Sequence, residues 1–471
     1  MKEIKEYKQA QKVFIFFLDI LIYHVSFIIS FLLRYDFKLS VFNYRVYQSV
    51  FPYIMLIFGA LNILTGMYVL YNKRKADLLY STVINQILMM IVVTTLIFFT
   101  HSLAFPRSVI ILSSVVSIIL LGGSRILLHH LNRKINGREK VMVVGDPMNC
   151  KRVVRNFEEA RNDVYKVTDL VYSNYYSHVK DNMGEVDLVY LTEGLPIEER
   201  NRILSLLTKE KKQMFLSSEF ENLSILNAEI MNIEDETFLK LTDFAISPEL
   251  SFIKYIIDLI ISLILIVVTS PILLVTAILV KITSPGPVLY KQVRITKGQK
   301  EFNILKFRTM SVTAEKDTGP VLATANDSRV TPLGRYLRSL RIDELPQLFN
   351  VIKGDMSLVG PRPERPHFVN IFKEENEYYY LRHNVRAGIT GYAQVNGKYA
   401  TDFNSKLNFD LLYIKEYSLI LDVQILLQTI KTVFDKVSSQ GLEDESMNLK
   451  DYELPKYINE HQIKDLNTKI K

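Results

Sequence analysis

Four apolar stretches near the start of the chain restrict the possible folds more than any other feature. Each is close to the roughly 20 residues that a helix needs to cross the hydrocarbon core of a membrane. The first is too long for a signal peptide and lacks a small-residue cleavage pattern, so we expect it to be retained. We therefore expect residues 1–137 to form four transmembrane helices, at Val13–Leu33, Val50–Leu70, Ile84–Leu103 and Val109–Leu131.

Basic residues flank these stretches mainly on one side. Lysines precede the first stretch, Lys73–Lys75 separates the second from the third, and Arg133–Lys140 follows the fourth. Lysine and arginine are enriched in cytoplasmic loops, so the N terminus and everything after the fourth helix are predicted to be cytoplasmic. Arg34, Lys38 and Arg45 weaken this pattern without reversing it.

The composition agrees with a membrane protein. A hydrophobic content of 48% is unusual for a purely soluble chain of 471 residues. The net charge of +7 fits basic helix flanks at an anionic lipid surface, so we expect membrane lipids and no nucleic acid as partners. The single cysteine, Cys150, excludes an intramolecular disulfide and a cysteine-rich zinc site.

Residues 138–240 show a different pattern, in which short apolar runs alternate with charged helical stretches. Val141–Gly145, Asp187–Leu191 and Gln213–Leu216 are predicted strands of an α/β, Rossmann-like middle domain. A dinucleotide site needs a glycine-rich turn after the first strand, and Gly145–Cys150 contains a single glycine. A structural or regulatory role is therefore favoured over nucleotide binding.

A fifth apolar stretch, Ile256–Val280, poses a topological problem. If it crossed the membrane, it would carry the basic segment Lys281–Arg308 outside, against the charge rule. Ser270 and Pro271 lie near its middle, and proline removes a helix donor and forces a bend. A hairpin that enters and leaves on the cytoplasmic side satisfies both observations, whereas a proline-kinked spanning helix is the alternative.

A carboxylate pair among arginines carries the strongest chemical signal. Asp343 and Glu344 lie in the run Arg341–Leu348, and Gly354–Pro363 follows closely with Arg362 near its end. Carboxylates can hold Mg²⁺ or attack phosphorus, and arginine forks match phosphate oxygens. The combination indicates phosphoryl chemistry beside a membrane. The structural alternative is a solvated acid pair at the start of a surface helix.

At this point the sequence resembles the bacterial sugar transferases, which move a sugar phosphate from a nucleotide sugar to a polyprenyl phosphate. The resemblance covers about residues 254–434 and implies an α-rich monotopic phosphoglycosyl transferase domain, residues 250–437, with a re-entrant helix broken at Ser270-Pro271. It rests on strings in a fixed order: Thr269-Ser270-Pro271, Ser284-Pro285-Gly286-Pro287, Lys306-Phe307-Arg308-Thr309-Met310, Asp343-Glu344-Leu345-Pro346-Gln347, Gly360-Pro361-Arg362-Pro363 and Gly388-Ile389-Thr390-Gly391.

The resemblance also implies roles for particular residues. Asp343 matches the nucleophile, and Glu344 matches the second member of the pair, which binds Mg²⁺ or positions the pair. Both are the expected metal ligands. Arg341 is expected to be solvated. Phosphate or substrate contacts are expected from Lys306, Arg308, Arg338 and Arg362, with Pro363 fixing the backbone beside Arg362.

The reaction implied is transfer of a hexose 1-phosphate from a UDP-sugar to undecaprenyl phosphate, with release of UMP and a covalent aspartyl-phosphosugar intermediate. This would be the first membrane step of exopolysaccharide, capsule or O-antigen synthesis. The expected location is the bacterial inner membrane, with the catalytic domain on the cytoplasmic face. A homodimer is the commonest closed assembly for such a chain.

Two other functions fit parts of the sequence. A membrane-bound nucleotide-sugar dehydratase or epimerase would need a catalytic Tyr-x-x-x-Lys, which Tyr176 and Lys180 match, but also the missing glycines. A non-enzymatic membrane scaffold is disfavoured by the intact Asp343-Glu344 pair. The polar tail, residues 438–471, is predicted to be mobile.

Overall fold

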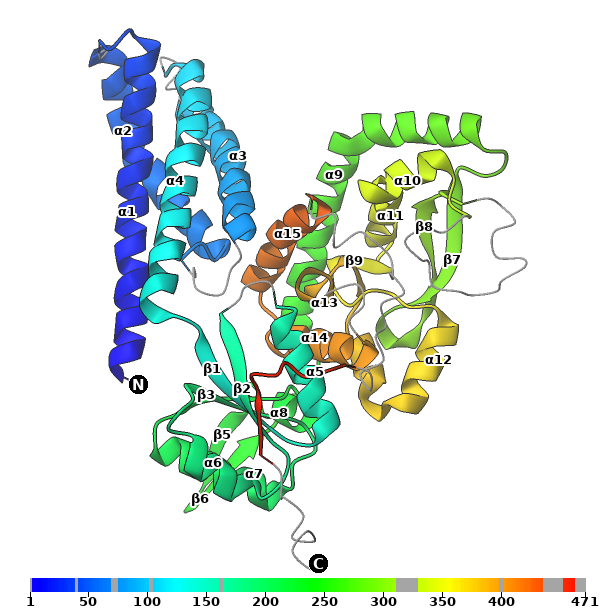
Figure 1. Ribbon diagram of the computed structural model, residues 1–471. Coiled ribbons are helices and arrows are strands. Elements are labelled where there is room, and N and C mark those ends of the chain that lie inside the picture. The colour runs from blue at the N-terminus through cyan, green and yellow to red at the C-terminus, as the bar shows by residue number, and fades with distance from the viewer. Residues whose placement is uncertain are drawn as a thin grey trace, which may run out of the picture. The chain divides into compact units, whose positions relative to one another are not determined.

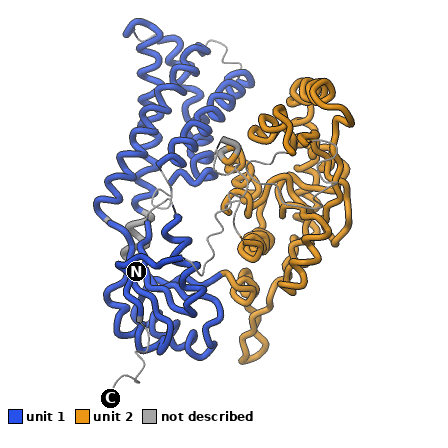
Figure 2. The backbone as a smooth tube through the Cα atoms, turned by 45° about the vertical axis from the view of Figure 1, so that its right-hand side comes forward, with its two compact units in different colours: residues 1–217, 447–471 blue, residues 218–446 orange. Residues whose placement is uncertain are grey.

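The computed structural model describes residues 2–38, 41–68, 75–100, 105–160, 164–310, 329–397, 402–434 and 452–461 (Figure 1). The chain forms two compact units. The first comprises residues 1–217 and 447–471, and the second comprises residues 218–446 (Figure 2). The first unit contains the apolar N-terminal helices and a parallel sheet, and the second contains Asp343 and Glu344.

A helix lies over most of each of the four apolar stretches predicted from the sequence, and residues 69–70 and 101–103 of those stretches lie outside the described residues. They are α1 (Lys2–Arg34), α2 (Val41–Leu64), α3 (Lys75–Phe99) and α4 (Arg107–Asn136). All four are long and apolar enough to cross a membrane, and so is α9 (Pro248–Thr283) of the second unit. The chain is therefore a membrane protein with a helical N-terminal part. Lys73 and Arg74 of the predicted cytoplasmic loop lie outside the described residues.

Polar contacts lie inside this helical part among mostly aromatic and aliphatic neighbours. Asp19 and Arg125 form a buried ion pair between α1 and α4, with side chains 0% and 1% exposed. Asn85 Nδ2 donates to Asn62 Oδ1 and Thr65 Oγ1, each at 2.8 Å. Because hydrocarbon offers no hydrogen bonds, such groups must find partners within the bundle, and they fix how the helices pair.

A five-stranded parallel sheet forms the middle domain, in the order β11-β2-β1-β3-β4. Three of its strands are those predicted, whereas β2 was not singled out in the sequence. The strands are β1 (Glu139–Val144), β2 (Tyr165–Val171), β3 (Leu188–Leu191), β4 (Gln213–Leu216) and β11 (Asn459–His461). The helices are α5 (Pro147–Glu158), α6 (Tyr175–Asn182) and α7 (Ile197–Lys209). The predicted α/β character of this region is confirmed.

The central strand β1 is buried on both faces over Val141–Val144, where every residue is apolar. Val141 and Val143 pack in one cluster with Cys150 of α5, whereas Met142 and Val144 pack in another with Ile203 of α7. Successive strand residues point to opposite faces, so a continuous run of apolar residues gives a strand covered by helices on both sides.

Part of the C-terminal tail is ordered on this sheet, contrary to the prediction that it is mobile. Strand β11 pairs in parallel with β2, and Ile458 packs into the same cluster as Cys150. Tyr457 OH donates to Glu158 Oε1 at 2.5 Å, and Lys166 Nζ lies 4.1 Å from the centre of the Tyr457 ring. The prediction failed because composition does not show the free sheet edge that residues 452–461 cover.

The second unit is mostly helical, with three small sheets. Its helices are α8 (Phe220–Ser224), α9 (Pro248–Thr283), α10 (Pro332–Ser339), α11 (Gln347–Ile352), α12 (Pro366–Glu375), α13 (Tyr392–Asn396), α14 (Phe403–Lys415) and α15 (Leu419–Phe434). Three 3₁₀ turns are η1 (Lys297–Gln299), η2 (Ile342–Glu344) and η3 (Glu377–Asn384). Strands β5 (Glu229–Ile233) and β6 (Glu236–Lys240) form one hairpin, β7 (Leu289–Ile295) and β8 (Glu301–Phe307) another, and β9 (Met356–Val359) pairs in parallel with β10 (Ala387–Thr390).

Residues 218–247 belong to this second unit, although the sequence placed the end of the middle domain near residue 240. Lys415 Nζ donates to the carbonyl oxygens of Thr242 at 2.5 Å and Ser224 at 3.2 Å. Phe220 stacks on Tyr378 with ring centres 3.8 Å apart. These contacts involve residues about 150 to 190 positions apart in the chain, so no local pattern reveals them.

Helix α9 continues through Pro271 but changes direction along its length (Figure 1). Proline cannot donate to the preceding turn, which accounts for a bend within a helix. The first half buries Lys254, Asp258 and Ser262 against its own unit, whereas apolar side chains such as Val267 are exposed. The helix thus has one polar attachment face and a large apolar surface.

Candidate active site

Asp343 and Glu344 lie together on the 3₁₀ turn η2, between α10 and α11. Arg341, the residue before this turn, has a φ of 53°, in the left-handed region that non-glycine residues rarely adopt. Asp343 is 7% exposed, and the side chain of Glu344 is 12% exposed. This burial excludes the alternative of a solvated acid pair on a surface helix.

Three cations from separate segments surround the Glu344 carboxylate. Lys306 Nζ of β8 lies 2.9 Å from Oε1, and Arg362 Nη2 lies 3.3 Å from the same oxygen. Arg341 Nη1 lies 3.6 Å from Oε2. Burial acts to raise the pKa of Glu344, but the charges of these three residues outweigh it and hold that pKa below its ordinary value. Glu344 is therefore a fixed negative charge at neutral pH.

Asp343 has a different environment although it is the adjacent residue. Among the described residues, no hydrogen bond or ion pair involves its carboxylate. Burial and the neighbouring charge of Glu344 raise the pKa of Asp343 to about 6, and nearby cations oppose this only in part. A buried carboxylate that is ionised at pH 7 but has no protein donor is suited to attack an electrophile.

The structure brings three of the predicted phosphate contacts to this carboxylate pair. Lys306 and Arg362 contact Glu344 directly, as described above. Arg338 donates from Nε to Thr309 Oγ1 at 2.9 Å, and its charge acts on Asp343. Together they provide a local excess of positive charge around two carboxylates, which favours a phosphate-bearing ligand.

The other predicted residues make contacts outside the carboxylate pair. Arg308 donates from Nη1 to the Pro285 carbonyl at 2.7 Å and from Nη2 to the Ser284 carbonyl at 2.6 Å, so it fixes the chain after α9. The Pro363 carbonyl accepts from Arg294 Nη1 at 3.0 Å. Ser270 and Pro271 lie inside α9, where Ser270 Oγ donates to the Val267 carbonyl at 2.8 Å.

Glycines of the family strings Gly360–Pro363 and Gly388–Gly391 permit close backbone contact beside the site. A Cβ atom on Gly360 would lie 2.4 Å from the Arg386 carbonyl oxygen, and one on Gly388 would lie 2.2 Å from the Gly360 nitrogen. A Cβ on Gly391 would lie 2.2 Å from the Gly360 carbonyl oxygen. Gly360, just after β9, therefore lies against Gly388 of β10 and Gly391, and this contact fixes the start of the Gly360–Pro363 turn that carries Arg362.

Sequence reasoning missed residues that the structure places at or behind the site. Arg341 was expected to be solvated, yet it is one of the cations around Glu344, and its position next to the pair was the available signal. Arg382 donates to the Arg362 carbonyl and is paired with Asp410. Arg382 and Asp410 are 28 positions apart and belong to no common string, so the sequence offered no signal for them.

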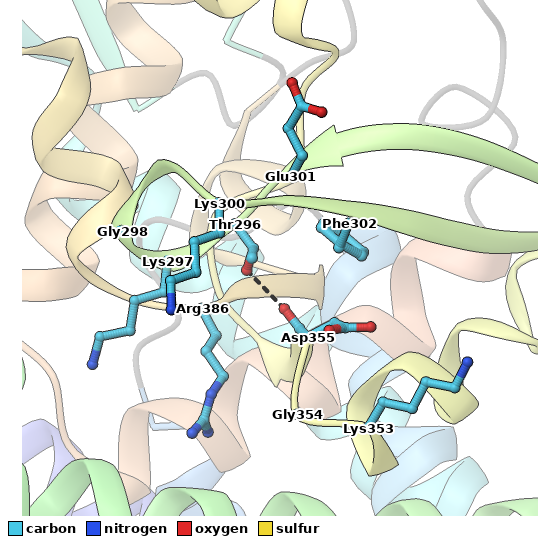
Figure 3. Close-up of a pocket in the computed structure, with 10 residues that line it drawn as sticks. All are labelled: Thr296, Lys297, Gly298, Lys300, Glu301, Phe302, Lys353, Gly354, Asp355 and Arg386. Carbon is cyan, nitrogen blue, oxygen red and sulfur yellow. Dashed lines mark hydrogen bonds between the residues drawn. The ribbon is translucent and has the colours of Figure 1, made fainter.

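A separate cavity of about 460 Å³ lies at the turn between β7 and β8 (Figure 3). Lys297, Lys300, Lys353 and Arg386 line it, and Thr296 Oγ1 donates to the Asp355 carbonyl at 2.7 Å. Glu301, the first residue of β8, also lines the cavity, whereas Lys306 lies near the other end of that strand. Asp343 and Glu344 do not line the cavity, so the candidate active site is a different place.

Within the part of the chain that the structure describes, the carboxylates of the candidate site that could bind a metal are Asp343 and Glu344. Among the described residues, no three His, Cys, Asp or Glu side chains gather in a way that could hold a metal ion. Mg²⁺ often binds through one or two carboxylates together with water and substrate phosphates. Asp343 and Glu344 fit this mode of binding, in which the substrate completes the ligand set.

In the middle domain, the polar groups that follow β1 and β3 form hydrogen bonds and an ion pair with neighbouring protein groups. Asp146 Oδ1 accepts from the backbone nitrogens of Met148 at 2.9 Å and Asn149 at 3.1 Å. Arg152 pairs with Glu193. A Cβ on Gly145 would lie 1.7 Å from Thr192 Oγ1, so side-chain atoms already occupy the space beside this turn. This is the place where doubly wound sheets commonly bind ligands.

Comparisons with known proteins match the part of the chain that holds the carboxylate pair. The profile of the family described as bacterial sugar transferase matches residues 249–436. Over 190 residues the chain is 49% identical to the UDP-N-acetylgalactosamine-undecaprenyl-phosphate N-acetylgalactosaminephosphotransferase of Aeromonas hydrophila, covering 40% of this chain and 45% of the relative.

Two further relatives extend the comparison. The chain is 37% identical over 253 residues to the UDP-glucose:undecaprenyl-phosphate glucose-1-phosphate transferase of Klebsiella pneumoniae, covering 52% of this chain and 54% of the relative. It is 40% identical over 191 residues to the uncharacterized sugar transferase EpsL of Bacillus subtilis, covering 41% of this chain and 90% of that relative. The chain thus spans about half the length of the first two relatives and most of the third.

Proposed function

The chain belongs to the bacterial sugar transferase family, and from this premise we propose that it transfers a sugar 1-phosphate from a UDP-sugar to undecaprenyl phosphate, releasing UMP. The relatives named for this reaction use UDP-glucose or UDP-N-acetylgalactosamine, so the donor class is a UDP-hexose or UDP-N-acetylhexosamine. The reaction is the first membrane step of synthesis of a polysaccharide such as an exopolysaccharide, capsule or O-antigen. Catalysis belongs to residues 250–437, and the middle domain has a structural or regulatory role.

The observation that carries this proposal is the asymmetry of the carboxylate pair. Glu344 is neutralised by Lys306, Arg341 and Arg362, whereas Asp343 is buried without a hydrogen-bond donor among the described residues. Two equivalent carboxylates would indicate a metal site alone. One fixed and one unengaged carboxylate instead provide both a scaffold for the surrounding cations and a nucleophile.

In the first step, a carboxylate oxygen of Asp343 attacks the sugar-bearing phosphorus of the UDP-sugar. The bond between that phosphorus and the bridging oxygen breaks, and UMP leaves with the electron pair. The product is an acyl phosphate between Asp343 and the sugar phosphate. Arg362, Arg338 and Lys306 bind the phosphate oxygens and stabilise the charge that develops on the leaving UMP.

In the second step, a phosphate oxygen of undecaprenyl phosphate attacks the same phosphorus. The bond to the Asp343 oxygen breaks, which restores the carboxylate and yields the undecaprenyl diphosphosugar. Asp343 and Glu344 would hold Mg²⁺, which would supply charge neutralisation to the bound diphosphate. Glu344 holds Lys306, Arg341 and Arg362 around the nucleophile throughout both steps.

The test is UMP release by the full chain in nanodiscs, measured across a panel that includes UDP-glucose and UDP-N-acetylgalactosamine. With Mg²⁺ and no lipid acceptor, labelled sugar phosphate should stay attached to the wild-type protein, and Asp343→Asn should remove the label. If UMP forms only after undecaprenyl phosphate is added and no adduct can be trapped, the two-step route is wrong. Asp343 would then act as a base or a metal ligand in a direct displacement.

The proposal includes a topology: four spans from α1 to α4, and α9 as a re-entrant hairpin that bends at Ser270-Pro271 in the bacterial inner membrane. The bend of α9, its exposed apolar surface and the basic residues after it support this arrangement (Figure 1). Both units then have their polar parts in the cytoplasm, where UDP-sugars are found.

Cysteine labelling distinguishes the hairpin from a fifth span. Lys240 and Lys300 are exposed, and they precede and follow α9 in the sequence. The only native cysteine, Cys150, is buried. Lys240→Cys and Lys300→Cys should react with an impermeant maleimide only when the cytoplasmic face is open. Labelling of the two positions from opposite faces would show that α9 crosses the membrane.

A further inference from the structure

A buried arginine, Arg382, and a partly buried one, Arg294, hold the backbone of the turn that carries Arg362. Arg382 Nη2 of η3 donates to the Arg362 carbonyl at 2.9 Å, and Arg294 Nη1 of β7 donates to the Pro363 carbonyl at 3.0 Å. Arg362 itself reaches Glu344 Oε1 with its Nη2 at 3.3 Å. Its backbone is thus fixed by other elements, while its guanidinium contacts the carboxylate pair.

Arg382 is fully engaged with protein groups. Its Nε and Nη2 lie 2.9 and 2.8 Å from Asp410 Oδ2, and its Nη1 donates to Tyr379 OH at 2.6 Å. The residue is 5% exposed, and Asp410 is 2% exposed. Since every nitrogen of the guanidinium already has a protein partner, Arg382 does not touch the reacting atoms.

The contact with a carbonyl matters because it acts on the Arg362 backbone and not on its side chain. The side chain is 43% exposed and reaches Glu344 from this backbone. Pro361 and Pro363 fix their own φ angles, but the orientation of the Arg362 carbonyl sets ψ of Arg362. A buried, charged donor on that carbonyl therefore restrains the backbone from which the guanidinium extends.

We propose that Arg382, held by Asp410 and Tyr379, is a positioning residue that fixes Arg362 for phosphate binding. The proposal rests on the proposed function, because that function makes Arg362 a phosphate contact. It adds a residue outside the family strings to the machinery of the site. Arg382 acts only through Arg362, and this dependence separates it from a residue that merely stabilises the fold.

A double-mutant cycle tests this dependence in the full chain. Arg382→Lys keeps a positive charge near Asp410, but one ammonium group cannot serve the carbonyl, the hydroxyl and the carboxylate together. In the wild-type background it should lower kcat/KM for UMP release by about 10- to 100-fold, because small displacements of a binding group reduce the rate strongly. In the Arg362→Ala background the same change should lower it by less than about 3-fold.

Lys415→Met is the matched control. Lys415 is also a buried cation that donates to backbone carbonyls, but it holds residues 224–242 and not the Arg362 turn. Its effect should be the same in both backgrounds, since it does not act through Arg362. Equal losses for Arg382→Lys in the two backgrounds would overturn the positioning role and leave only a role in stability.

A spectroscopic readout makes the test independent of turnover. A spin label on Arg362→Cys should become more mobile when Arg382→Lys is added, and should not change when Lys415→Met is added. Tyr379→Phe, which keeps the charged pair, should give a smaller increase if Arg382→Lys fails to fold. Unchanged label mobility with Arg382→Lys, or with Tyr379→Phe where only that variant folds, would overturn the proposal. Absence of UMP release by the wild-type protein would overturn the proposed function alone.

Discussion

The middle domain and the second unit both place charged side chains where a parallel strand ends, but they do so in different ways. At the end of β1 and β3, Asp146 caps α5 and Arg152 pairs with Glu193. At the turn after β9, Arg362 joins other cations around Glu344, and Asp343 remains without a hydrogen bond among the described residues. One group of charges is paired internally, and the other retains an unengaged carboxylate.

The difference shows where to look for chemistry in a chain with two α/β regions. Groups that satisfy one another locally stabilise a fold, and a ligand would have to break their bonds before it could bind. A buried carboxylate with a raised pKa and neighbouring cations remains reactive at the expense of stability. The following experiments test this contrast, from the largest expected effect to the smallest.

Asp343→Asn should abolish UMP release and lipid product, since the amide cannot serve as the nucleophile. The same variant should be more stable than the wild type at pH 7. A buried carboxyl whose pKa is raised to about 6 supports folding when it is protonated and loses that contribution as the pH rises through its folded pKa. The expected gain is roughly 1–3 kcal/mol.

Thermal unfolding followed by circular dichroism provides this measurement in detergent micelles. The gain of Asp343→Asn should shrink as the pH falls toward 4, where the wild-type carboxyl is also neutral. An inactive but destabilised variant would show that Asp343 has an undetected partner in the fold. Asp410→Asn is a suitable contrast, because removing that carboxylate leaves the buried Arg382 guanidinium without its negatively charged partner, so this variant should be less stable.

Glu344→Gln should lose activity by about 100-fold or more, because the cations lose the charge that holds them at the site. Unlike Asp343→Asn, it should destabilise the protein at pH 7. A carboxyl with a lowered folded pKa contributes stability above its ordinary pKa and loses it as the pH falls. The loss should be about 1–3 kcal/mol in the same unfolding assay. A stabilised Glu344→Gln would contradict the division of roles within the pair.

The first half-reaction should slow as the pH falls below about 6, the pKa to which burial and Glu344 raise Asp343. Below that pH the rate should fall about tenfold per unit, because only the ionised form attacks. Single-turnover UMP release without lipid acceptor is the proper measurement, since the acceptor phosphate also titrates near neutral pH. Arg362→Ala should move the midpoint upward, because it removes a charge that favours the carboxylate.

A chain of residues 218–446 should retain transferase activity within about tenfold of the full protein, because the carboxylate pair and its cations lie entirely in the second unit. Starting at Ser218 keeps the contacts of Lys415 with Ser224 and Thr242, whereas a start after Lys240 removes part of them. UMP release after reconstitution into lipid is the measurement. Complete inactivity of the folded, membrane-bound fragment would show that the first unit participates in the reaction.

Arg152→Ala and Glu193→Ala should change UMP release by less than about 2-fold. They break a partly exposed ion pair of the middle domain, which contains none of the proposed catalytic residues. The free energy of unfolding should change by no more than about 1 kcal/mol. A loss of activity in either variant, without loss of stability, would show that the middle domain controls the catalytic unit.

The sequence by itself determined the elements that depend on local patterns. Apolar stretches of membrane length gave α1 to α4, since length and hydropathy are properties of contiguous residues. Apolar runs located β1, β3 and β4 for the same reason. The ordered strings around Asp343 pointed to the family, because each string is a run of contiguous residues that can be read directly from the sequence.

Only the tertiary structure decided which neighbours each charge acquired. It gave the adjacent residues Asp343 and Glu344 different environments and placed Arg341 beside Glu344. It also placed the Arg308 guanidinium against backbone carbonyls after α9. It also joined β11 to β2 and Arg382 to Asp410. Burial and pairing arise between residues far apart in sequence, and Coulomb energies depend on distance and solvent exposure, so no local pattern could have set them.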